Sequence, residues 1–80
     1  MEFCVYIIYS PSIDKYYVGH TENLNKRMEE HRLKKNLGAN DWLLKYSETF
    51  FTRSEAMIRE IEIKKKKRRT YLEWLINTPI

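Results

Sequence analysis

The segment Phe3–Tyr9 constrains the fold of this 80-residue chain more than any other. It is an unbroken apolar run rich in β-branched and aromatic side chains, without alternation between apolar and polar positions. A strand with one face in water alternates, whereas a strand covered on both faces does not. The run is also far too short to span a bilayer. We therefore predict a central β-strand here, with other elements packed on both of its faces.

The other segments predict an α+β fold with the element order β-β-α-β-α-α, in which a small three-stranded antiparallel sheet is flanked by helices. Pro11 and Asp14 supply a turn, so the second strand should pair with the first as a hairpin. The first helix begins at Thr21 or at Glu22-Asn23 and is closed by Gly38. The expected elements after the first strand are Tyr16–His20, the helix ending at Leu37, Trp42–Phe51, Thr52–Lys67 and Tyr71–Ile76. We expect one domain over residues 1–80.

Several positions inside these elements carry expectations of their own. Gly19, near the end of the second strand, indicates a bulge or a close backbone approach. Thr52 and Glu55 form a capping box at the head of the helix expected over Thr52–Lys67. In the third strand, the side chains that share one face are Leu44, Tyr46, Glu48 and Phe50. In the last helix, the side chains expected to pack back are Leu72, Trp74 and Leu75.

Composition favours a folded, basic domain. Hydrophobic residues make up 42% and aromatic residues 14%, which suits a globule rather than a disordered chain. The single cysteine, Cys4, excludes an intramolecular disulfide and a cysteine-based zinc site, and its apolar surroundings indicate a buried, inert thiol. The net charge of +4 raises the odds of a nucleic-acid partner. With no secretory signal and no membrane-spanning segment in the sequence, we expect a cytoplasmic protein without a membrane partner.

Glu60 gives the strongest indication of function, because it lies on the helix face that should be buried. At about 100° per residue, it falls inside an apolar arc. That arc is formed by Ala56, Met57 and Ile63 and extended by Ile58 and Ile61. A buried, unpaired carboxylate is costly, so such a group usually has a cation, a metal or a catalytic task. The alternative is an edge position from which Glu60 reaches solvent.

Four further side chains could act together with Glu60. Tyr6 and Tyr17 lie on the paired strands, where two phenols can come close on one face. Arg27 and His31 are one helical turn apart, and a guanidinium suits phosphate recognition. A lone carboxylate can hold one hard divalent ion, so the set suits phosphodiester hydrolysis. The alternatives are ordinary aromatic packing for each tyrosine and a surface ion pair for Arg27.

Three motifs in this order make the chain resemble the GIY-YIG nuclease superfamily, particularly its small standalone domains. The first is Val5-Tyr6-Ile7-Ile8-Tyr9-Ser10, and the second is Tyr17-Val18-Gly19, followed by Thr21-Glu22-Asn23-Leu24 and Arg27. The third is Thr52-Arg53-Ser54-Glu55-Ala56, followed by Arg59-Glu60 and Ile63-Lys64. The resemblance covers roughly Phe3 to Ile76. Cys4, Val5 and Val18 stand where the founding motifs have a glycine and two isoleucines.

The resemblance implies roles for the matching residues. Tyr6 or Tyr17 would orient or activate the attacking water, and Arg27 would be the catalytic arginine. Glu60 would be the single ligand of one Mg²⁺ or Mn²⁺ ion. Two further positions match family slots: His31 stands where relatives carry histidine or tyrosine, and His20 where some carry a lysine near the phosphate. Asn77 is the candidate for the family's late asparagine, which helps to hold the active site.

The basic run Lys64–Arg69 follows Glu60 directly. It could be a patch that contacts phosphates without regard to sequence, through Lys64, Lys65, Lys67 and Arg68. The alternatives are a solvated helix end favoured by the helix dipole and a nuclear-localisation signal, which any such run resembles. No zinc-finger spacing or RNP-like aromatic motif indicates base-specific readout.

These inferences predict a metal-dependent endonuclease that hydrolyses DNA phosphodiester bonds, with structure-specific DNA repair or recombination as its setting and with room for a partner protein that supplies specificity. A first alternative is a catalytically weak nucleic-acid-binding module with a nuclease-like fold. A second is a protein-interaction domain in which the tyrosines and Glu60 are structural. The near-complete set of catalytic side chains favours the enzyme.

Overall fold

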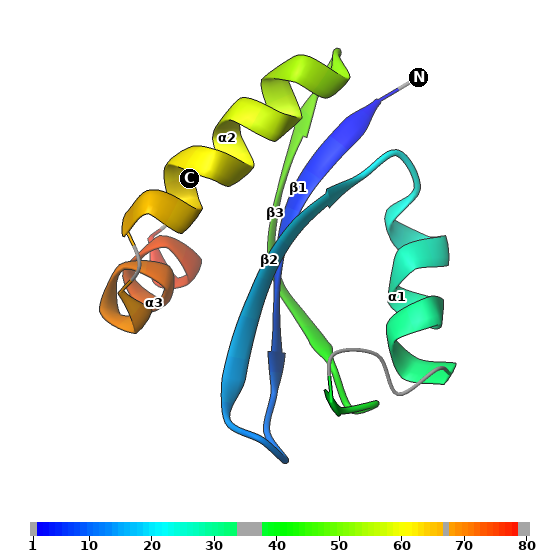
Figure 1. The fold of residues 1–80 in the computed structure, drawn as a ribbon, viewed down its shortest axis with the longest axis vertical. Coiled ribbons are helices and arrows are strands. Elements are labelled where there is room, and N and C mark those ends of the chain that lie inside the picture. Colours follow the sequence, from blue (N-terminus) through cyan, green and yellow to red (C-terminus); the bar gives the residue numbers. More distant parts are fainter. Residues whose placement is uncertain (1, 34–37, 67, 79–80) are drawn as a thin grey trace.

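The computed structural model describes residues 2–33, 38–66 and 68–78. Its elements are β1 (Phe3–Ser10), β2 (Lys15–Thr21), α1 (Leu24–Leu33), β3 (Leu43–Phe50), α2 (Arg53–Lys66) and α3 (Arg69–Asn77). Figure 1 shows the sheet with α1 on one face and with α2 and α3 on the other. The predicted α+β fold and its element order are confirmed. The part of the first helix expected over residues 34–37 lies outside the described residues, as does Lys67.

β1 is the central strand of the sheet, as its apolar run predicts. The strand order is β2-β1-β3, and both neighbours run antiparallel to β1. Its side chains supply two separate cores, one on each face. The core under α2 and α3 consists of Val5, Ile7, Val18, Ala56, Ile63 and Leu75. The core under α1 consists of Tyr6, Ile8, Ala39 and Trp42.

A β-bulge in β3 corrects the expected face of Leu44. Ile7 pairs with Tyr46 but Ile8 pairs with Leu44, so Lys45 is the extra residue between them. An extra residue shifts the side-chain alternation by one and turns the following positions to the other face. Leu44 therefore leaves the face of Tyr46 and is 44% exposed.

The inner face of α2 is narrower and more polar than the apolar arc predicts. Ala56 and Ile63 are fully buried, but Met57, Ile58 and Ile61 are 44%, 59% and 49% exposed. Between the two buried residues lie Arg59 and Glu60, both of which bond to strand residues: Arg59 forms a two-pronged ion pair with Glu48. The helix is thus oriented so that Arg59 and Glu60 reach their partners on the strands, and the three apolar side chains are left exposed to solvent.

The first turn of α2 has the hydrogen bonds that its sequence predicts. The Thr52 hydroxyl accepts a bond from the Glu55 backbone N–H at 3.2 Å and donates to the Glu55 carboxylate at 3.0 Å, which confirms the capping box.

In α3, Leu75 is buried and Leu72 is half-buried. Trp74 is 59% exposed and stacks on Tyr71, so the expectation that it packs back is wrong. Its position falls outside the stripe that faces the sheet.

Candidate active site

Tyr6, Tyr17 and His31 form one aromatic cluster on the α1 face of the sheet. The ring centroids lie 6.4 Å apart for the two tyrosines and 6.1 and 6.0 Å from His31 to Tyr6 and Tyr17. The Tyr6 hydroxyl is 3.3 Å from His31 Nε2. Trp42 closes the cluster behind His31, at a centroid distance of 6.3 Å. The fold therefore brings together three of the four side chains predicted to be catalytic from α1 and the hairpin.

Gly19 permits this arrangement. It pairs with Tyr6 across the β1–β2 ladder, and the phenol lies over its backbone. A Cβ at position 19 would lie 2.7 Å from the Tyr6 hydroxyl oxygen and 3.0 Å from a ring carbon of Tyr17. No side chain fits at such distances without displacing the phenols. The expected close backbone approach is therefore confirmed.

Burial sets the protonation of this cluster. Desolvation, followed by the charge effects of nearby groups, raises the pKa of Tyr6 far above its ordinary value. Desolvation and the neighbouring Arg27 guanidinium lower the pKa of His31 below its ordinary value. His31 is only 2% exposed, and among the described residues its Nδ1 has no hydrogen-bond partner. At neutral pH the pair is thus a neutral phenol beside a neutral imidazole, and that imidazole can accept a proton.

Glu60 lies beside His20, near the C-terminal end of β2, on the face of the sheet opposite the aromatic cluster. Its side chain is 16% exposed, so it does not extend freely into solvent. Oε1 accepts a bond from His20 Nδ1 at 2.6 Å, and Oε2 accepts one from Lys64 Nζ at 2.6 Å. Burial alone would raise the pKa of Glu60, but the bonds from Lys64 and His20 outweigh it and lower the pKa. Glu60 is therefore a carboxylate anion with a cationic environment.

Arg27 lies beside a polar pocket at the start of α1. Asn23 caps the helix, since its side-chain oxygen accepts the Lys26 N–H at 3.0 Å. Arg27 Nε is 3.8 Å from Glu30, a weak version of the ion pair considered for it, and in the described part of the chain this buried nitrogen has no hydrogen-bond partner. The pocket is lined by His20, Thr21, Glu22, Asn23, Lys26, Arg27, Glu30 and Arg53. An unpartnered guanidinium donor beside such a pocket suits an anionic ligand.

His20 and Lys64 connect the two faces of the site around the edge strand β2. His20 lines the Arg27 pocket and also bonds Glu60. Lys64 Nζ, bound to Glu60, lies 5.8 Å from the Tyr17 ring centroid. The site thus combines a deprotonated carboxylate, a phenol–imidazole pair and a guanidinium. Groups of these kinds suit phosphodiester hydrolysis.

The comparisons with known proteins agree with this geometry. A family model described as the GIY-YIG catalytic domain matches residues 2–73. The chain belongs to the GIY-YIG family. Its fold is similar to the solution NMR structure of the UPF0213 protein BH0048 from Bacillus halodurans, with a TM-score of 0.58 and 27% sequence identity, over 91% of this chain and 81% of that chain. No curated protein matches the chain.

Membership of the GIY-YIG family supports a nuclease-type function and a nucleic-acid substrate. Within the described residues, no helix is long and apolar enough to cross a membrane.

The described ranges contain no group of three or more histidine, cysteine or acidic side chains that could hold a metal ion. A metal ion at Glu60 would have one carboxylate ligand, with His20 beside it. That donor set fits Mg²⁺, which keeps several waters and binds through one or two carboxylates plus substrate phosphates.

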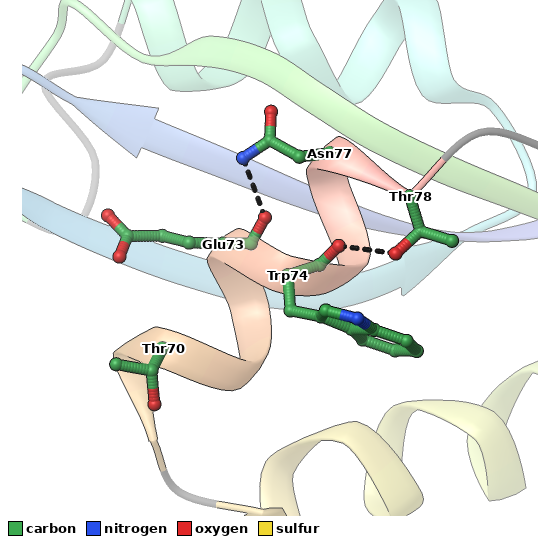
Figure 2. Close-up of a pocket in the computed structure, with 5 residues that line it drawn as sticks. All are labelled: Thr70, Glu73, Trp74, Asn77 and Thr78. Carbon is green, nitrogen blue, oxygen red and sulfur yellow. Dashed lines mark hydrogen bonds between the residues drawn. The ribbon is translucent and has the colours of Figure 1, made fainter.

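Asn77, the candidate for the family's late asparagine, lies in α3. It is an exposed residue at the end of α3, and its side-chain amide donates to the Glu73 backbone carbonyl at 2.8 Å. Figure 2 shows this bond in a shallow pocket lined by Thr70, Glu73, Trp74, Asn77 and Thr78. The bond holds the side chain to its own helix.

The residues predicted to contact phosphates differ in their surroundings: two are exposed, and two bond Glu60. Lys65 is exposed at the end of α2, and Arg68 is exposed in the extended link before α3. Lys64 is engaged with Glu60, and His20 with the same carboxylate. Lys67 lies outside the described residues.

Sequence reasoning missed Arg53 as a site residue, although it stands inside the third motif. Its Nη2 is 3.3 Å from Glu22 Oε2, and both residues line the Arg27 pocket. Positions 22 and 53 are distant in sequence, and no periodicity or spacing connects them. Only the folded arrangement of α2 against the end of β2 brings them together.

Proposed function

We propose that this GIY-YIG domain is a divalent-metal-dependent endonuclease that hydrolyses DNA phosphodiester bonds. The observation that carries the proposal is Glu60, a carboxylate only 16% exposed, whose lowered pKa keeps it anionic beside Lys64, which in turn lies 5.8 Å from the Tyr17 ring centroid. An uncompensated buried carboxylate would be costly, so this position is suited to a cation.

Each group has a separate task in this proposal. Glu60 would hold one Mg²⁺ or Mn²⁺ ion, which when bound supplies polarisation of the phosphate. The Arg27 guanidinium neutralises the negative charge that develops on the phosphate. The neutral His31 imidazole would accept the Tyr6 hydroxyl proton while that hydroxyl oxygen takes a proton from the attacking water. Tyr17, whose ring lies beside those of Tyr6 and His31, would hold these two side chains in place.

The biological setting of the proposed activity is branched or damaged DNA in repair or recombination, with the exposed Lys65 and Arg68 holding the phosphate backbone. Contacts to phosphates position a nucleic acid but carry no sequence information. Because such a surface does not read sequence, the DNA site would be selected by its shape or by a partner protein.

The test is cleavage of labelled duplex, single-stranded, flap and four-way-junction DNA with Mg²⁺ or Mn²⁺, comparing wild type with Glu60→Gln. The substitution keeps the shape of the side chain and removes its charge. Metal polarisation contributes several kcal/mol, so we expect the cleavage rate to fall by on the order of a hundredfold or more. Glu62→Gln, an exposed acid two residues later, should cleave as wild type does. Equal cleavage by Glu60→Gln, or cleavage that survives a chelator, would contradict the proposal.

A second candidate is a module that binds nucleic acid without cutting it. The observation that favours it is the engagement of both Glu60 oxygens, by His20 and by Lys64. In that case every DNA of the panel would remain intact while binding stayed strong at low salt and weakened at high salt.

A further inference from the structure

Lys64 is held against the active-site carboxylate, whereas Lys65 and Arg68 of the same basic run are exposed and lack such a bond to any described residue. It follows Glu60 by one helical turn, and its Nζ lies 2.6 Å from Glu60 Oε2. The same ammonium is 5.8 Å from the centroid of the Tyr17 ring. The Lys64 side chain is 49% exposed, whereas the carboxylate is 16% exposed. Lys64 therefore covers the carboxylate from the solvent side.

This arrangement places Lys64 in competition with any ion that Glu60 binds. Each carboxylate oxygen already accepts one hydrogen bond, Oε1 from His20 and Oε2 from Lys64, so an incoming cation competes with these two donors for the carboxylate. Lys64 is the easier to displace, because it is the more exposed of the two and its four-carbon side chain is flexible. Ion pairs one turn apart on a helix are also weak.

We propose that Lys64 is the resident cation of the Glu60 site, which leaves when a divalent ion binds and thereby sets the affinity for that ion. The inference rests on the proposed function, in which Glu60 is the metal ligand. Exchange of one cation for another keeps the half-buried carboxylate neutralised in both states, so neither state contains an uncompensated buried charge. Lys64 acts through Glu60 and is a positioning residue rather than a catalytic one.

The experiment is a titration of the DNA-free protein with Mg²⁺ alone, followed by the NMR shifts of the backbone amides around Glu60. Four proteins are compared: wild type, Lys64→Met, Lys65→Met and Glu60→Gln. Methionine keeps the length of lysine and removes its charge. Lys65→Met is the matched control, since it makes the same change in net charge at the next, exposed position. Lys64→Gln repeats the test if Lys64→Met has a lower melting temperature than wild type.

Direct competition predicts that Lys64→Met binds Mg²⁺ more tightly than wild type, by on the order of threefold. Lys65→Met should show a clearly smaller change, because it alters the field at the site without freeing a carboxylate oxygen. An unchanged or weaker affinity in Lys64→Met overturns the inference, and so does an equal gain in both variants. Binding that is lost in Glu60→Gln but equal in wild type and Lys64→Met overturns the inference alone. Absence of Glu60-dependent binding in wild type overturns the proposed metal site together with it.

Discussion

Gly19 and Tyr6 form the tightest fit of the site, and the fit is testable by one methyl group. The Cβ of Gly19→Ala would lie 2.7 Å from the Tyr6 hydroxyl oxygen and 2.9 Å from its Cζ. We expect the variant to lose about 1–3 kcal/mol of unfolding free energy, as overpacked cores do. The displaced phenol should also move away from His31. Chemical denaturation measures the first effect, and the chemical shifts of the His31 ring report the second.

The control is the same substitution in a Tyr6→Phe background. Removal of the hydroxyl oxygen removes the closest contact, so Gly19→Ala should cost less there than in the wild-type background. An equal cost in both backgrounds would assign the loss to the β2 backbone instead of the phenol.

At the scale of single residues, the sequence predicts the site as far as local spacing can reach. Glu60 is identified because helical periodicity turns it inward, and its bond to Lys64 spans one turn. The other partner of Glu60, His20, is 40 residues away, and its bond depends on how α2 crosses β2. Periodicity describes one element at a time and contains no information about that crossing. The pairing of Glu22 with Arg53 was missed for the same reason.

At the scale of elements, an ion pair attaches α3 to the turn of the β1–β2 hairpin. Arg69 Nη2 is 2.6 Å from Asp14 Oδ1, and Nη1 is 3.0 Å from Oδ2. The bond from Arg69, followed by the one from the Tyr9 hydroxyl, lowers the pKa of Asp14 from 3.8 to about 2. A carboxyl with a lowered pKa in the folded state stabilises the fold above its unfolded pKa and ceases to do so as the pH falls through the folded value.

We therefore expect the melting temperature to decrease between about pH 4 and pH 2, partly through loss of this ion pair. Asp14→Asn should lower the melting temperature at pH 6. Between about pH 4 and pH 2, the melting temperature of this variant should decrease less than that of wild type. Thermal unfolding at low ionic strength, in steps of pH, measures both effects. Glu29→Gln, an exposed acid on α1, is the control and should follow the wild-type profile. An Asp14→Asn profile parallel to wild type would show that the pair contributes nothing, as exposed pairs sometimes do.

The elements themselves were predictable where a strong local signal exists. The apolar run of β1, the capping box of α2 and the hairpin turn all have such signals, and each is confirmed. The bulge at Lys45 has none, because no glycine or proline marks it, and one extra residue was enough to reverse the face of Leu44. The outward turn of Met57 likewise follows from the charged pairs on the inner face, which outweigh the preference of the apolar side chains.

At the scale of the whole molecule, the basic run contains both paired and unpaired cations. Lys64 and Arg69 form ion pairs with Glu60 and Asp14, whereas Lys65 and Arg68 have no ion pair with any described residue. A cation that is already paired with a carboxylate is less available to neutralise a DNA phosphate and release its counterion. The electrostatic surface is therefore smaller than six consecutive basic residues suggest.

We expect Lys65→Gln and Arg68→Gln each to reduce the slope of log affinity against log salt concentration by about one, with little change in stability. Fluorescence anisotropy with a labelled DNA between about 50 and 200 mM salt measures the slope. Arg69→Gln is the contrasting variant: it should lower the melting temperature and leave the slope close to that of wild type. Unchanged slopes in both of the first two variants would place the DNA on a different surface.

The central position of β1 has a kinetic consequence. Its pairing with β2 closes through a short turn, so Tyr6 and Tyr17 can meet early, whereas the bond between His20 and Glu60 requires closure of a 40-residue segment. Long closures cost more entropy and are formed later in folding. We expect the hairpin to bring the two phenols together before α2 delivers its carboxylate. A chain in which only the hairpin has formed thus has the two phenols without the carboxylate, and the complete centre appears only when folding is complete.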